Sequence, residues 1–134
     1  MEQRILQYRR YIDEWLERHE AQTAAEDAAE RSRQRTEVDD RITQHLVQVG
    51  FFQHERLIHL IVTVTFALLE ILAILLSVLG DSLFTLLLPV VILILLIPYI
   101  RHYYILENEV QKMYVQYDRM QALREKLAEA IQKE

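Results

Sequence analysis

The sequence predicts an all-α fold in which a two-helix transmembrane hairpin carries long helical extensions. Three observations support this prediction. The chain of 134 residues has only two Gly and two Pro, too few turn residues for a many-stranded β fold or a Gly-rich phosphate loop. Two long apolar stretches lie between polar arms. Apolar residues in both arms recur at helical spacing, which predicts a coiled coil or a helical bundle.

The two apolar stretches predict two transmembrane helices. Residues 57–79 form a stretch of 23 residues, and residues 83–100 form an uncharged stretch of 18. At about 1.5 Å per residue of helix, both are long enough to cross a hydrocarbon core of about 30 Å. Only Gly, Asp and Ser at residues 80–82 separate them, and these residue types suit a helix C-terminus and the next N-cap. We therefore expect residues 57–100 to form a tight transmembrane hairpin, with a soluble helical bundle as the alternative.

The distribution of Lys and Arg predicts the orientation of the hairpin. The turn at residues 80–82 carries neither residue type, whereas basic residues flank both outer ends of the hairpin: Arg41, Arg56, Arg101, Lys112 and Arg119. Because basic residues favour the cytoplasmic side, both termini should be cytoplasmic and the turn external. The first stretch follows 56 residues of polar arm, so a cleavable signal peptide is not expected.

The C-terminal arm, residues 101–134, is predicted to be a coiled-coil helix that continues the second transmembrane helix without a break. Its apolar residues alternate spacings of four and three, through Tyr99, Tyr103, Leu106, Val110, Met113, Tyr117 and Met120. Arg124 would come next, but Leu123 and Leu127 take over, which is a three-residue phase shift.

The N-terminal arm, residues 1–56, is predicted to supply amphipathic cytoplasmic helices. Two sets of residues repeat the same spacing: Ile5, Tyr8, Ile12 and Trp15, then Val38, Ile42, His45, Val49 and Phe52. Thr23 and Glu26 form a capping box just after a plausible break between these helices. Such seams favour self-assembly into a homo-oligomer.

The charge balance of the arms argues against nucleic acid as a partner. Residues 1–54 carry 8 Arg and 11 acidic residues, and residues 101–134 carry 6 basic and 6 acidic residues. Neither arm is therefore a polybasic patch that would neutralise phosphates. The expected partners are membrane lipid, further copies of the chain and, as an alternative, another membrane protein.

A polar stripe on the first transmembrane helix is the main candidate site. Helical spacing places its members within about 40° of one another: His59, Thr63, Glu70 and Ser77. A charged group near the bilayer centre costs about 2.5–3.5 kcal/mol, so Glu70 should not face lipid as a carboxylate. Either protonated Glu70 donates to the Ile94 carbonyl that Pro98 leaves free, or copies of the stripe converge on an oligomer axis. A contact with a different membrane protein is the third possibility, and Pro89 and Pro98 are expected to kink the second helix.

Histidines offer a weaker candidate for metal binding. Glu55 and His59 are four residues apart, and His102 should return to a similar depth on the second helix, so the three side chains can hold a divalent ion. An interfacial salt bridge or a lipid headgroup contact is the simpler interpretation. His54 and His59 are five residues apart and cannot share a metal as an i, i+4 pair does. No arrangement of residues indicates catalysis or a cofactor, so an enzyme is not expected.

The middle of the chain resembles a group of small proteins. Residues 50–66, reading GFFQHERLIHLIVTVTF, and residues 99–107, reading YIRHYYILE, are similar to uncharacterised small two-span membrane proteins of Gram-positive bacteria. This resemblance implies the cytoplasmic membrane of a bacterium and supplies no catalytic residue, ligand or partner. Together these features predict a self-associating scaffold or regulatory subunit, with a homo-oligomeric ion or proton channel lined by the first transmembrane helix as the alternative.

Overall fold

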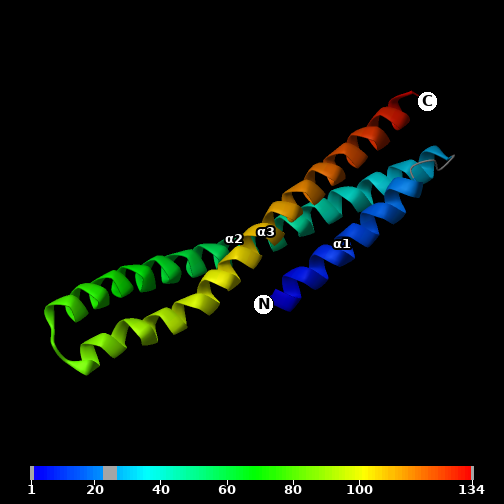
Figure 1. The fold of residues 1–134 in the computed structure, drawn as a ribbon. Helices are drawn as coiled ribbons and strands as arrows, with labels where there is room; N and C mark the ends of the chain where they lie inside the picture. Colours follow the sequence, from blue (N-terminus) through cyan, green and yellow to red (C-terminus); the bar gives the residue numbers. More distant parts are fainter. Residues whose placement is uncertain (1, 23–26, 134) are drawn as a thin grey trace. The chain divides into compact units, whose positions relative to one another are not determined.

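The protein is all-helical, as the sequence predicts. The structure is a computed structural model that describes residues 2–22 and 27–133, and within these ranges it contains three helices and no strand. Helix α1 spans Glu2–Gln22, α2 spans Ala28–Leu79, and α3 spans Leu83–Gln132 (Figure 1). The capping box expected at Thr23 and Glu26 lies outside the described ranges.

Helices α2 and α3 are each longer than the apolar stretch that they contain. Helix α3 continues from the second apolar stretch to Gln132, so the predicted unbroken C-terminal helix is confirmed. Helix α2 is likewise continuous from Ala28, so the first apolar stretch begins inside a helix. Helix α3 passes through Pro89 and Pro98 without ending at either, and the kinks expected there stay a prediction.

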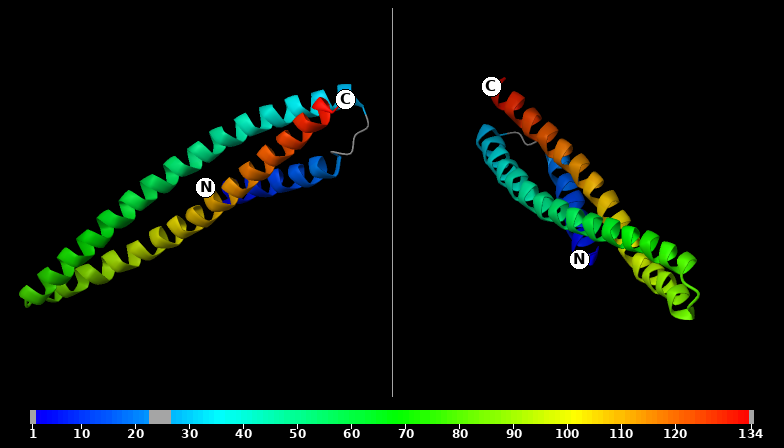
Figure 2. Two further views of the ribbon diagram at one scale, coloured as in Figure 1. Left: turned by 90° about the horizontal axis from the view of Figure 1, so that it is seen from above. Right: turned by 90° about the vertical axis from the view of Figure 1, so that its left-hand side faces the viewer.

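Contacts divide the chain into two units. The first unit comprises Met1–Phe52 and Asn108–Glu134, and the second comprises Gln53–Glu107. In the first unit, α1 lies beside the N-terminal part of α2 and the C-terminal part of α3 (Figure 2). The second unit contains the remaining parts of α2 and α3, joined by residues 80–82.

The first unit has a hydrophobic core built from all three helices. Its buried members are at most 6% exposed: Ile12, Trp15, Leu16, Val38, Ile42, Met120, Leu123 and Leu127. Leu123 and Leu127 are buried while the Arg124 side chain is 42% exposed, which confirms the phase shift predicted from the sequence. The apolar seams of the arms therefore pack against each other within a single copy of the chain.

A buried polar network joins α1 to α3 beside this core. Glu109 is only 5% exposed, and its carboxylate accepts hydrogen bonds from Arg9 at 2.5 Å and Lys112 at 2.6 Å. Arg9 also pairs with Asp13 at 2.9 Å. Gln116 donates through Nε2 to an Asp13 carboxylate oxygen at 2.7 Å and to the Arg9 carbonyl at 2.8 Å. These bonds offset the cost of burying Glu109 and the amide nitrogen of Gln116, whereas Oε1 of Gln116 has no partner among the described residues.

The second unit has the opposite burial pattern, because its large apolar side chains point outward. Between residues 57 and 100, 26 of them are 38–85% exposed, whereas only Ala73 and Leu96 are buried hydrophobics. Both helices that pass through this unit are long and apolar enough to cross a membrane. An apolar surface this continuous is unusual on a protein that faces water. The second unit therefore supports a membrane location.

Candidate functional site

The residues of the polar stripe lie on the face of α2 that contacts α3. His59, Thr63, Glu70 and Ser77 are all half-buried, and Ala73 on the same face is 3% exposed. Aromatic contacts cross from this face to α3: the rings of Phe66 and Tyr99 stack at 5.6 Å between centroids. The stripe is therefore directed toward the other helix of the same copy.

The two hydroxyl groups of the stripe are satisfied by their own helix. Thr63 donates to the His59 carbonyl at 2.7 Å, and Ser77 donates to the Ile74 carbonyl at 2.8 Å. Bonds of this type occupy the hydroxyl proton without a contact to another helix. Neither hydroxyl group therefore needs a partner outside α2.

Glu70 differs, because one of its carboxyl oxygens has no partner. Its Oε2 atom is buried and makes no hydrogen bond with any residue that the structure describes. The bond from protonated Glu70 to the Ile94 carbonyl stays a prediction. Ile94 is 63% exposed and lies on the outer face of α3, whereas Leu96, at 7%, faces inward. A buried polar atom without a partner costs free energy, and within the stripe this applies to Oε2 of Glu70 and to Nδ1 of His59.

The second unit also brings together the three residues that were considered as metal ligands. The Nε2 atoms of His59 and His102 lie 3.9 Å and 4.0 Å from the same Glu55 oxygen, Oε1. The two imidazole rings are 4.4 Å apart between centroids. One ligand atom from each residue lies within 4.8 Å of the others. We call these three residues the Glu–His–His cluster.

An open pocket adjoins this cluster. Its volume is about 280 Å³, and its lining includes both histidines together with Pro98 and Tyr99. The Nδ1 atom of His59 is buried and has no hydrogen-bond partner among the described residues. Arg56 lies next to Glu55 in the sequence, but its guanidinium pairs with Glu107 at 2.9 Å. Within the described residues, the Glu55 carboxylate faces the two imidazoles.

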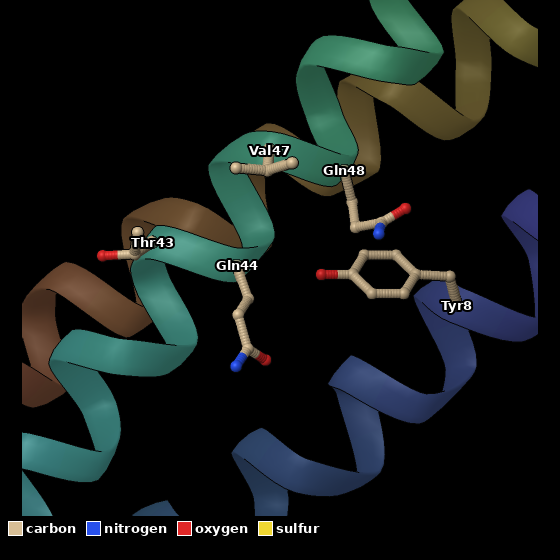
Figure 3. Close-up of a pocket in the computed structure, with 5 residues that line it drawn as sticks. All are labelled: Tyr8, Thr43, Gln44, Val47 and Gln48. Atoms are coloured by element: carbon tan, nitrogen blue, oxygen red, sulfur yellow. The ribbon is translucent and has the colours of Figure 1, made fainter.

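A second pocket lies in the first unit, between α1 and α2. Tyr8 projects from α1 toward α2 and lies between the side chains of Gln44 and Gln48 (Figure 3). The pocket has a volume of about 310 Å³, and Thr43 and Val47 complete its lining. Because these groups are neutral, the pocket offers no strong electrostatic attraction for a charged ligand.

His45, beside Tyr8, is a core residue, which confirms the prediction from its seam position. It is fully buried, and its ring bonds two other helices. A carbonyl oxygen only accepts, so Nε2 carries the proton and donates to the Met113 carbonyl at 2.9 Å. Nδ1 then accepts from the Tyr8 hydroxyl at 3.1 Å. Burial raises the pKa of Tyr8 to about 12, so its hydroxyl stays protonated and able to donate.

The neutral state of His45 predicts a pH-dependent stability of the first unit. Burial lowers the pKa of His45, and the bond to the Met113 carbonyl opposes this shift. The unfolded chain then binds a proton more readily than the folded chain. The stabilisation is complete above the unfolded pKa of about 6.5 and is lost as the pH falls below it, by at most about 1.4 kcal/mol per pH unit. Urea unfolding at a series of pH values measures the free energy of unfolding at each pH. Below about pH 6.5, this free energy should fall less steeply with decreasing pH for His45→Gln than for the wild type.

Exposed His54 provides the control for this experiment. His54→Gln should keep the wild-type pH dependence. If the free energy of unfolding depended on pH equally in His45→Gln and the wild type, the assignment of His45 as a neutral core residue would be contradicted.

No protein-family model matches the chain, and no curated protein or solved structure matches it either. The site is therefore interpreted from its own geometry.

Proposed function

We propose that the chain is a small integral membrane protein. Residues 57–100 cross the membrane as a hairpin, and the first unit forms a helical bundle in the cytoplasm. The outward-facing apolar surface of the second unit carries this proposal, with 26 large side chains that are 38–85% exposed. In lipid these side chains need no protein partner, because the hydrocarbon chains are equally apolar.

The basic residues support an orientation with both termini in the cytoplasm. Residues 80–82 contain no Lys or Arg, whereas Arg56 and Arg101 flank the membrane-spanning segment at its other end. The resemblance to two-span proteins of Gram-positive bacteria supports the cytoplasmic membrane of a bacterium as the location.

We infer that the protein self-associates as a scaffold or regulatory subunit. The core of the first unit closes within one copy, so this core leaves little apolar seam for a partner. In the stripe, Oε2 of Glu70 and Nδ1 of His59 lack a partner among the described residues, and Glu70 is the deeper of the two in the hairpin. A second copy that opens part of the α2–α3 contact would supply a hydrogen-bond donor to the Glu70 carboxyl group. Hydrogen bonds between helices contribute to association in lipid.

A homo-oligomeric channel with Glu70 in its pathway is the alternative. In such a channel the polar stripe would line a shared, hydrated axis. The stripe instead faces α3, and Thr63 and Ser77 already donate within α2. These contacts favour the scaffold over the channel.

One set of measurements separates these roles. We expect the native mass of the detergent-solubilised protein to equal two or more copies. In reconstituted vesicles, ion flux should stay at background for the wild type, for Glu70→Gln and for the matched control Asp81→Asn, which removes an acid in the turn. A monomeric mass would contradict self-association. Wild-type flux that Glu70→Gln changes and Asp81→Asn does not would replace the scaffold with the channel.

A further inference from the structure

We propose that Glu55, His59 and His102 form a binding site for a divalent transition-metal ion, and that Zn²⁺ is the ion their ligand atoms fit best. The site is distinct from the proposed scaffold role. All three ligands come from one copy of the chain, so metal binding does not depend on self-association.

The convergence of three ligand atoms carries this proposal. Both histidines direct Nε2 toward one oxygen of Glu55, at 3.9 Å and 4.0 Å. In a tetrahedral site with bonds of about 2.0–2.1 Å, neighbouring ligand atoms lie about 3.3 Å apart. The two Glu55–His distances therefore have to shorten by about 0.6–0.7 Å, and the distance between the two histidine ligand atoms, which is within 4.8 Å, by at most about 1.5 Å. Rotations of these side chains achieve such shifts.

The positions of the ligands in the fold keep them together without the ion. Glu55 and His59 are four residues apart on α2, so they project from the same face of the helix. His102 comes from α3, and its ring contacts that of His59. The side chains of Glu55, His59 and His102 are 15%, 24% and 25% exposed, respectively. An ion bound here would link α2 to α3 and stabilise their contact.

The ligand types of the cluster suit a divalent cation. Two imidazole nitrogens face one carboxylate oxygen at 3.9 Å and 4.0 Å, which is longer than a direct hydrogen bond. A divalent ion instead uses the lone pairs of two neutral imidazoles and one carboxylate. Arg56, which follows Glu55 in the sequence, pairs with Glu107, and Arg101, which precedes His102, is exposed.

The open pocket provides room for a fourth ligand. Both histidines line this volume of about 280 Å³, so a water molecule or an exogenous group can complete the coordination shell. Three protein ligands with one open position is the ligand set of many zinc sites that bind water or substrate. Zinc, cobalt and nickel all accept imidazole nitrogen with carboxylate oxygen, and Zn²⁺ has the least demanding geometry.

The test is a titration of the full-length protein in detergent, after treatment with a chelator. Isothermal calorimetry with Zn²⁺ alone should give one ion per chain. Glu55→Gln and His102→Asn should each weaken binding at least about tenfold. His54→Asn is the matched control: His54 is exposed and adjacent to Glu55 in the sequence, so its replacement should leave the affinity unchanged. Titration with Co²⁺ should give intense visible absorption that Glu55→Gln abolishes.

A variant that keeps a ligand atom separates a lost ligand from a lost fold. His102→Asp places a carboxylate where the imidazole was and should bind Zn²⁺ more tightly than His102→Asn does. Absence of Zn²⁺ binding by the wild type would overturn the proposal. So would equal affinity of the wild type, Glu55→Gln and His102→Asn, because the ion would then bind elsewhere.

Discussion

Replacing Trp15 with Ala is expected to lower the free energy of unfolding of the first unit by about 3–5 kcal/mol. Trp15 is 4% exposed and belongs to the core shared by all three helices. Its ring stacks on His19 at 4.1 Å between centroids and lies beneath the Arg41 guanidinium at 5.3 Å. Its Nε1 atom has no partner in the described part of the chain, so the substitution removes packing and a cation–π contact without breaking a hydrogen bond.

A loss of this size is large against the total stability of a domain, about 5–15 kcal/mol. Because α1 contributes Trp15 to the core, we expect its amides to lose protection in hydrogen exchange before those of α2 and α3. Leu16→Ala should act in the same direction, since Leu16 is fully buried, and it retains the only Trp of the chain as a fluorescent probe.

Tyr11 provides the matched control on the same helix. It also lies beneath Arg41, at 5.4 Å, but it is 43% exposed. Tyr11→Ala should therefore cost less than about 1 kcal/mol. Protection of α1 that is unchanged in Trp15→Ala would show that the core of the first unit does not hold α1 in place.

The apolar pattern predicted the core of the first unit because heptad spacing depends only on helix geometry. Leu123 and Leu127 illustrate this: their phase shift was visible in the sequence and is present in the structure. Glu109 and Gln116 were not predicted. Each precedes an apolar seam position by one residue, and each is buried because α3 faces α1 as well as α2. A pattern of spacings describes one face of a helix and does not show how many helices cover it.

The sequence predicts which residues of a candidate site share a helix face, but not which neighbouring helix that face contacts. Helical periodicity alone groups the polar stripe on one face, but the direction of that face depends on contacts with α3. Depth along the helix makes the Ile94 carbonyl a candidate partner for Glu70, and this bond stays a prediction because the exposed Ile94 side chain does not define the direction of its carbonyl. The short turn at residues 80–82 sets the register between α2 and α3, and this register brings His102 beside Glu55 and His59. The contact was anticipated because His102 lies at a similar depth along α3.

Introducing Arg at the centre of the first apolar stretch is expected to block membrane insertion. Leu68 is the middle residue of the stretch 57–79 and is 63% exposed. An Arg at the centre of a transmembrane helix costs about 2.5–3.5 kcal/mol, and the lost Leu adds about 0.5 kcal/mol. Glu70 already makes the membrane insertion of the same stretch less favourable. Because the two residues are only two positions apart, an Arg at position 68 would not face Glu70 and could not pair with it.

The absence of Cys makes insertion measurable, because Ser82→Cys introduces a single thiol in the turn. In whole cells, a membrane-impermeant reagent should label this thiol from outside. Leu68→Arg in the same background should lower the equilibrium constant of insertion by about 100- to 1000-fold and so reduce labelling. Val115→Arg is the matched control: Val115 is 58% exposed in the first unit, where we expect water, and the same substitution should leave labelling unchanged. The side chains of Val115 and Leu68 are almost equally exposed, so the two substitutions differ mainly in the medium that surrounds them. Equal labelling of both Arg variants would mean that residues 57–79 do not lie in lipid.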